Sequence, residues 1–176
     1  MKWVQFPLHP DTPVDGQSLE ELFRGRQIDI EAAHAHMQGL MRAEGLPYGR
    51  RTRTYNSRLA QELGKWADAE WPGLAIHDAM FKAYFVDDLN IADESVLMDI
   101  VRSVGLPPDD ATRVLRERRW RGAVDADWEK SRAYGVTAVP TFVSGGYGVV
   151  GAQPYTTLER FLDQAGARRK DVPNPA

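Results

Sequence analysis

The stretch Ala138-Val139-Pro140-Thr141-Phe142-Val143, followed by Ser144-Gly145-Gly146-Tyr147-Gly148 and Val149-Val150-Gly151-Ala152-Gln153, decides the fold of this chain. A proline has no N–H to donate, which confines it to the start of an edge strand or to a special bond. X–Pro is the only common cis peptide. A cis proline just before a strand turns the preceding backbone toward solvent, where Val139 is able to pair with an extended ligand. The stretch therefore predicts a binding edge at Val139 and Pro140.

Two further features of the sequence predict short strands. The glycines at 145 and 146 suit the positive φ angles of a hairpin turn, so we expect strands at 141–143 and 149–150. These glycines make no phosphate loop, because no helix N-terminus follows them at once. Near the start of the chain, alternating side chains over 3–6 predict another strand, which Pro7 ends.

The middle of the sequence is helical in pattern. We expect a loop over 11–27 with one helical turn at 19–23, then helices marked by apolar residues at three- and four-residue steps. Asp93 suits a helix N-cap and Pro108 suits the first position of a helix. The stripe over 76–85 is apolar around most of its circumference, which predicts a buried helix. The apolar stripes lie at 32–41, 59–67, 76–85, 96–104, 114–115, 124–128 and 158–165.

The order and spacing of several segments resemble the DsbA-like thiol-disulfide oxidoreductases of the FrnE type. These proteins are related to 2-hydroxychromene-2-carboxylate isomerases and kappa-class glutathione transferases. The resemblance covers nearly the whole chain and implies an α/β class, with a thioredoxin-like fold and a large helical insertion. It implies one domain over 1–166 with the insertion at 29–134, and composition predicts a disordered tail at 167–176. The segments that carry it are WVQFPLHP (3–10), YNSRLA (55–60), AMFKAYF (79–85), GVTAVPTF (135–142) and GAQP (151–154).

The sequence departs from this family at its start. Family members open with a strand and a helix whose N-terminus carries Cys-x-x-Cys, or a serine in the glutathione-dependent branch, and this sequence begins after that unit. None of the 176 residues is cysteine. Disulfide exchange needs a thiolate as the attacking group, so we expect the chain as given to lack this chemistry. Without the central strand the remaining strand edges are unpaired, so we expect the chain either to fold poorly or to self-associate, with a homodimer favoured over a stable monomer.

The resemblance also implies a set of substrate-binding residues. Val139 and Pro140 form the docking edge, Asn56 lies near the active-site mouth, and Gly151 and Gln153 lie near the γ-glutamyl end of glutathione or an equivalent substrate. The residue types are also compatible with structural roles that involve no ligand. Asn56 is a good helix N-cap, Gln153 suits a cap of the last helix, and Pro140 suits a trans proline that opens an edge strand.

Composition and spacing argue against several other functions. The net charge of -3 gives no general attraction to nucleic acid or to an anionic membrane. We therefore interpret two basic clusters as solvated faces with ion pairs: Arg50, Arg51 and Arg53, and the run 116–121. His34 and His36 diverge on a helix, so we expect no metal site there, and we expect no cofactor.

The family likeness implies a protein disulfide oxidoreductase or isomerase, inactive as written because the redox cysteines are absent. A non-catalytic, thioredoxin-like module that binds a substrate or a protein is an alternative. A fragment of a glutathione-dependent isomerase or transferase is another. We expect a peptide or thiol-containing partner at Val139 and Pro140. Since no apolar run is long enough to span a bilayer and no signal segment is visible, we expect a cytoplasmic location.

Overall fold

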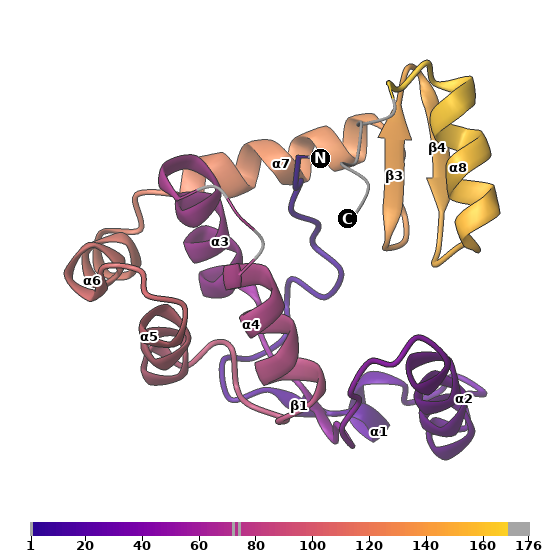
Figure 1. Cartoon of the computed structure of the whole chain (residues 1–176). Helices are drawn as coiled ribbons and strands as arrows, with labels where there is room; N and C mark the ends of the chain where they lie inside the picture. Colours follow the sequence, from indigo (N-terminus) through magenta and orange to yellow (C-terminus); the bar gives the residue numbers. More distant parts are fainter. Residues whose placement is uncertain (1, 72, 74, 169–176) are drawn as a thin grey trace, which may run out of the picture. The chain divides into compact units, whose positions relative to one another are not determined.

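The computed structural model describes residues 2–71, 73 and 75–168 (Figure 1). The chain forms two compact units, residues 1–128 and 129–176. The prediction of one domain over 1–166 stays a prediction, and 169–176 of the predicted tail lie outside the described residues. The elements, in chain order, are β1 (Gln17–Ser18), α1 (Leu19–Leu22), α2 (Ile30–Ala43), β2 (Arg53–Thr54), α3 (Arg58–Glu70), α4 (Ala75–Phe85), α5 (Glu94–Ser103), α6 (Pro108–Glu117), α7 (Arg121–Ala133), β3 (Thr141–Ser144), β4 (Tyr147–Val150) and α8 (Tyr155–Gln164).

The core of the first unit lies among helices α3, α4, α5 and α6. Helix α3 contacts α4 and α6, and α5 contacts the same two helices (Figure 1). Trp66 and Leu63 on α3, with Leu97 and Val101 on α5, have less than 2% of their surface exposed. Each buried side chain of this size contributes about 1.5–3 kcal/mol relative to its exposed state. The apolar stripes of the sequence therefore converge on one helical core.

The predicted helix ends of this core are confirmed. Asp93 is the N-cap of α5, and its Oδ1 accepts a hydrogen bond from the Ser95 N–H at 2.7 Å. Pro108 is the first residue of α6. Gly105 follows α5 with a φ of 72°, a conformation that costs glycine little. Local capping chemistry is thus enough to place these ends from the sequence.

The structure has a small sheet that the sequence did not predict, and its first strand lies within the loop expected over 11–27. β1 pairs antiparallel with β2, with Gln17 opposite Thr54 and Ser18 opposite Arg53. The helical turn predicted at 19–23 is present as α1, which follows β1 directly. Gly16 has a φ of 74°, and a Cβ there would lie 2.4 Å from Cδ1 of Tyr55. Two-residue strands have too few side chains for alternation to be recognised, which is why the pattern missed them.

The strand predicted over 3–6 is wrong. This segment forms no ladder, because side chains from helices supply its hydrogen-bond partners. The Gln5 N–H donates to Oδ2 of Asp127 at 3.0 Å, and Nε2 of Gln61 donates to the Phe6 carbonyl at 3.3 Å. The Trp3 ring stacks on His77 with 4.8 Å between ring centroids.

Two helices leave apolar side chains exposed, and one of them, α4, was predicted to be buried. None of the α2 side chains is buried, and Met37 and Leu40 are 40% and 48% exposed. In α4, Ile76 and Met80 are buried, but Phe81 is 48% exposed. An apolar stripe gives the period of a helix, whereas burial needs a neighbouring element on that side.

The second unit consists of a hairpin packed on one helix. β3 pairs antiparallel with β4 from Thr141 opposite Val150 to Ser144 opposite Tyr147, and α8 lies beside β4 (Figure 1). The turn glycines at 145 and 146 have φ angles of 56° and 83°, as predicted. Phe161 on α8 is only 7% exposed. Helix α7 begins in the first unit and ends in the second.

A buried carboxylate ties α3 to the residue after α6. The Glu62 side chain has no exposed surface, and Arg118 donates to it twice, from Nε at 2.8 Å and from Nη2 at 2.7 Å. Nε of Arg58, one turn earlier on α3, donates to Oε1 of Glu62 at 2.8 Å. Burial by itself raises the pKa of Glu62, but the hydrogen bonds and charges of Arg118 and Arg58 outweigh burial and hold that pKa below its ordinary value.

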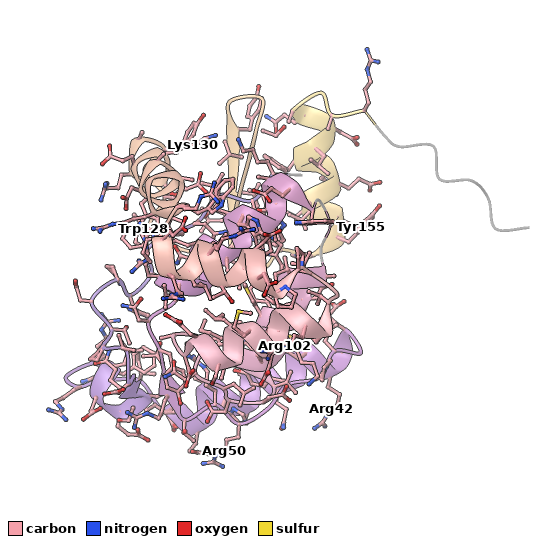
Figure 2. All side chains as sticks on the ribbon, turned by 90° about the vertical axis from the view of Figure 1, so that its left-hand side faces the viewer. Arg42, Arg50, Arg102, Trp128, Lys130 and Tyr155 are labelled. Atoms are coloured by element: carbon pink, nitrogen blue, oxygen red, sulfur yellow. The ribbon has the colours of Figure 1, made fainter. Side chains whose placement is uncertain are left out.

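Arg58 extends the same network to α7. Its Nη2 donates to the Arg121 carbonyl at 2.8 Å and to Oδ1 of Asp125 at 2.7 Å. The guanidinium carbon lies 4.6 Å from the ring centroid of Trp128, which Figure 2 labels on α7. Two carboxylates and two guanidinium groups thus join α3, the residue after α6 and the start of α7.

We predict that Glu62→Gln lowers the free energy of unfolding by about 3 kcal/mol, because it leaves two guanidinium groups without their buried counter-charge. Chemical denaturation followed by circular dichroism measures this loss. The matched control is Asp99→Asn, which removes an exposed pair with Arg102 (Figure 2) and changes stability by about 0.5 kcal/mol or less. Equal losses in the two variants would contradict the role of Glu62.

The same network predicts a dependence of stability on pH. Since the folded-state pKa of Glu62 lies below the unfolded-state value, its contribution is full above the unfolded-state pKa. It is lost as the pH falls through the folded-state pKa. Unfolding free energies measured across this acidic range fall more steeply for the natural chain than for Glu62→Gln, and parallel curves would refute the prediction.

Candidate functional site

The predicted binding edge is a bend that leads into β3. The Val139–Pro140 peptide bond is cis. The Thr141 hydroxyl donates to the Ala138 carbonyl at 2.7 Å, which closes the bend on itself. The Val139 side chain is 47% exposed, and its main-chain N–H and C=O make no hydrogen bond with any described residue. The bend therefore presents an unpaired donor, an unpaired acceptor and an apolar side chain at one residue.

Gly151 and Gln153 join this bend at the open end of the hairpin. The Gly151 N–H donates to the Pro140 carbonyl at 2.7 Å, next to the pair formed by Thr141 and Val150. Nε2 of Gln153 donates to the Val150 carbonyl at 2.8 Å. Gln153 is therefore not the cap of the last helix, whose N-cap is Pro154 without a side-chain bond. Four of the five predicted site residues thus share one end of β3 and β4.

Asn56 belongs to the first unit and has contacts of its own there. Its Nδ2 donates to the carbonyls of Thr12 at 2.8 Å and Pro10 at 3.3 Å. Its Oδ1 accepts from the Arg58 N–H at 2.9 Å, at the start of α3. The N-cap of α3 is Ser57, so Asn56 acts one residue earlier than the cap position that its type suggests. The side chain fastens the loop at 10–12 to the start of the helix.

The second unit has several exposed apolar side chains besides Val139. A shallow cavity of about 290 Å³ lies where α8 meets β4. Tyr155, which Figure 2 labels at the start of α8, is 76% exposed. Such a surface suits the side chains of an extended ligand. The other exposed side chains are Tyr134, Val143, Tyr147, Val150 and Leu162. The cavity is lined by Tyr147, Gly148, Val149, Thr157, Arg160, Phe161 and Gln164.

The arginines that the sequence assigned to a solvated face divide into different roles. Arg50 forms an ion pair with Glu31 on α2, and Figure 2 shows its side chain at the surface. Nη2 of Arg53 instead donates to the carbonyls of Asp15 and Gly16, at 3.2 and 3.1 Å. Arg51 forms no ion pair within the described residues, and its guanidinium lies over the Tyr84 ring.

Sequence reasoning missed the buried network around Glu62. The spacing of four residues between Arg58 and Glu62 is a visible signal of a helical ion pair. The approach of Arg118 is not visible, because 56 residues separate it from Glu62 along the chain. Nε2 of His77 on α4 donates to Oδ1 of Asp68 on α3 at 2.7 Å, and this pair was missed because it depends on how the two helices pack.

Comparison with known proteins gives one family and a set of similar structures. The family described as DSBA-like thioredoxin domain matches residues 1–163. The crystal structure of a probable DsbA oxidoreductase from Streptomyces coelicolor is 28% identical and has a TM-score of 0.81, covering 94% of this chain and 74% of that one. The cytosolic disulfide reductase DsbM from Pseudomonas aeruginosa is 19% identical with a TM-score of 0.54, covering 78% of this chain and 71% of that one. No curated protein sequence matches the chain.

These matches agree with the fold that the sequence predicted. The α/β, thioredoxin-like fold with its large helical content is confirmed. Within the described part of the chain, no helix has both the length and the apolar character needed to cross a membrane.

Proposed function

The chain belongs to the DSBA-like thioredoxin domain family, and from this premise we propose that it binds a peptide or thiol-containing substrate along the Val139–Pro140 edge. The observation that carries the proposal is the unpaired main chain of Val139, beside a side chain that is 47% exposed. An extended ligand that adds to such an edge gains main-chain hydrogen bonds from its backbone. Exposed apolar residues near the open end of the hairpin, Val150 among them, then accept its side chains, whereas Val143 lies near the turn at the other end.

The chain as given performs substrate docking without disulfide exchange. Exchange begins with the attack of a thiolate on a disulfide sulfur, and the 176 residues include no cysteine. Family membership associates the fold with thiol oxidoreductases, while the residues present supply the docking edge alone. Gly151 and Gln153 belong to this edge in the proposal, since both adjoin Pro140 or its neighbours in the hairpin. Asn56 is included on the family likeness, with its structural role unchanged.

The proposal also covers the subgroup within the family, the cellular location and the oligomeric state. We assign the chain to the FrnE type on the segments that resemble it, and we place it in the cytoplasm by analogy with DsbM, which is described as cytosolic. We also propose a homodimer, because the outer edge of a two-stranded sheet invites pairing with another strand. Light scattering of the purified chain tests the dimer, and a mass equal to that of one chain would contradict it.

We predict that Val139→Asp weakens binding of an extended polypeptide about tenfold or more, because it places a carboxylate where an apolar side chain meets the ligand. The probe is insulin B chain, reduced and carboxamidomethylated so that its thiols are blocked. Isothermal titration calorimetry measures the affinity. Loss of binding with an unchanged circular dichroism spectrum supports the edge as the docking site.

The matched control is Val143→Asp, which adds the same charge to an exposed valine of the same hairpin, 48% exposed in the natural chain. Val143 lies within the paired part of β3, opposite Gly148. We expect it to retain most of the affinity. Equal weakening by both substitutions would indicate a general effect of charge on the hairpin, and the Val139 edge would then be the wrong site.

We also predict that the purified chain of 176 residues does not reduce the disulfides of insulin in the presence of dithiothreitol faster than dithiothreitol does alone. The turbidity of the precipitating insulin B chain measures the rate. A rate that rises in proportion to the concentration of the chain would show a catalytic route without cysteine and refute the prediction.

A further inference from the structure

The chain turns back along α2 at Gly45. This glycine has a φ of 68°, and its N–H donates to the Arg42 carbonyl at 3.1 Å. The Leu46 N–H donates to the Met41 carbonyl at 2.9 Å. The two bonds form a Schellman motif, which pairs carbonyls at the end of a helix and reverses the chain. The main chain at the end of α2 is therefore satisfied locally, and the segment 45–50 returns along the helix.

Two side-chain contacts show that this returning segment runs antiparallel to α2. The ring of Tyr48 lies 5.4 Å from that of His34, in the second turn of the helix. Nη2 of Arg50 lies 2.5 Å from Oε1 of Glu31, in the first turn. Since Leu46 is bound near the last turn, successive alternate residues of the segment meet the helix progressively closer to its start.

A cavity of about 290 Å³ lies between α2 and the returning segment, entirely within the first unit. Residues four apart share one face of a helix, so His34, Gln38 and Arg42 lie in a row of about 12 Å along α2. Tyr48 stands at one end of this row and Leu46 at the other. The size is at the lower limit for ligand sites and suits a small molecule. The residues that line the cavity are Gln38, Arg42, Gly45, Leu46 and Tyr48.

Arg42 brings an unpaired positive charge to this cavity. Its side chain is exposed, extends from the surface in Figure 2, and makes no ion pair or hydrogen bond with any described residue. Glu31, on the same face of α2, is already paired with Arg50. Glu44 is two residues after Arg42 and therefore lies on another side of the helix, and no ion pair joins the two. The donors of the guanidinium are thus available to a ligand.

We propose that the groove between α2 and the segment 45–48 binds a small carboxylic acid with an aromatic body. The planar guanidinium of Arg42 matches a carboxylate and donates two parallel, charge-assisted hydrogen bonds to it. The amide of Gln38, which makes no hydrogen bond with a described residue, supplies a further donor. The ring of Tyr48 and the side chain of Leu46, which is 53% exposed, contact the aromatic body.

The charge of the cavity favours a carboxylate over a phosphate group. A phosphate monoester carries a charge of about −1.5 to −2 at neutral pH, whereas a carboxylate carries one negative charge. Arg42 is the one basic side chain among the described residues that line the cavity, so it neutralises a carboxylate fully and a phosphate in part. The site uses no residue of the Val139 edge and is independent of the proposed docking function.

The test is a titration of the ¹⁵N-labelled full chain with 3-phenylpropionate, followed by NMR at constant ionic strength. Two matched compounds separate the charge from the ring, since 3-phenylpropionamide keeps the ring without the charge and acetate keeps the charge without the ring. We expect saturable shifts of the resonances of Arg42 and Tyr48, with 3-phenylpropionate binding about tenfold or more tightly than either matched compound. Equal affinities for the acid and its amide would overturn the proposal.

Arg42→Gln and Arg24→Gln form a matched pair of variants. Arg24, which follows α1 in the same unit, is also exposed and without an ion pair to a described residue, but it does not line the cavity. We expect Arg42→Gln to weaken binding of 3-phenylpropionate about tenfold and to remove its advantage over the amide, while Arg24→Gln changes neither. Equal weakening by both variants would indicate a general effect of charge and overturn the proposal. The absence of saturable shifts in the natural chain would overturn it as well.

Discussion

The buried carboxylate of Glu62 is the constraint on which the first unit depends. A carboxylate without solvent exposure is tolerated only when its charge is matched and its oxygens accept hydrogen bonds, and Arg58 and Arg118 meet both conditions. Arg118, which donates to Glu62, itself has a φ of 52°, a backbone conformation that is uncommon for residues other than glycine. The pairing thus fixes where α6 ends and where α7 begins.

The helical core and the hairpin differ in how much apolar surface they bury. Helices α3 to α6 bury their apolar faces around Trp66, Leu63 and Leu97, and this burial stabilises the first unit. The hairpin of the second unit keeps a large part of its apolar surface exposed and leaves Val139 with unpaired main-chain groups. Exposed edges weaken a small sheet but are the feature that an extended ligand needs. Under the proposed function, stability and recognition therefore rest on separate parts of the chain.

The basic groups of the first unit illustrate how one sequence cluster divides in space. Arg50, Arg51 and Arg53 are near neighbours in sequence, yet they bind a carboxylate, two aromatic rings and two carbonyls respectively. Of the three, Arg51 has an Nε that is buried without a hydrogen-bond partner among the described residues. Charge counting along the sequence treats the three residues alike, because it does not see which partners the fold brings to each.

The sequence by itself determined the features that rest on local chemistry. The cap at Asp93, the start of α6 at Pro108 and the glycine turn at 145–146 follow from preferences of single residues, and the apolar periodicity located the helices. The tertiary structure alone decided which partners distant residues meet. Residues 3–6 alternate like a strand, but Asp127 and Gln61 take the place of a ladder, and α2 has an apolar stripe in which no residue is buried within the described part of the chain. The physical reason is that hydrogen bonds and burial depend on neighbours that are remote in sequence, and a local pattern carries no information about them.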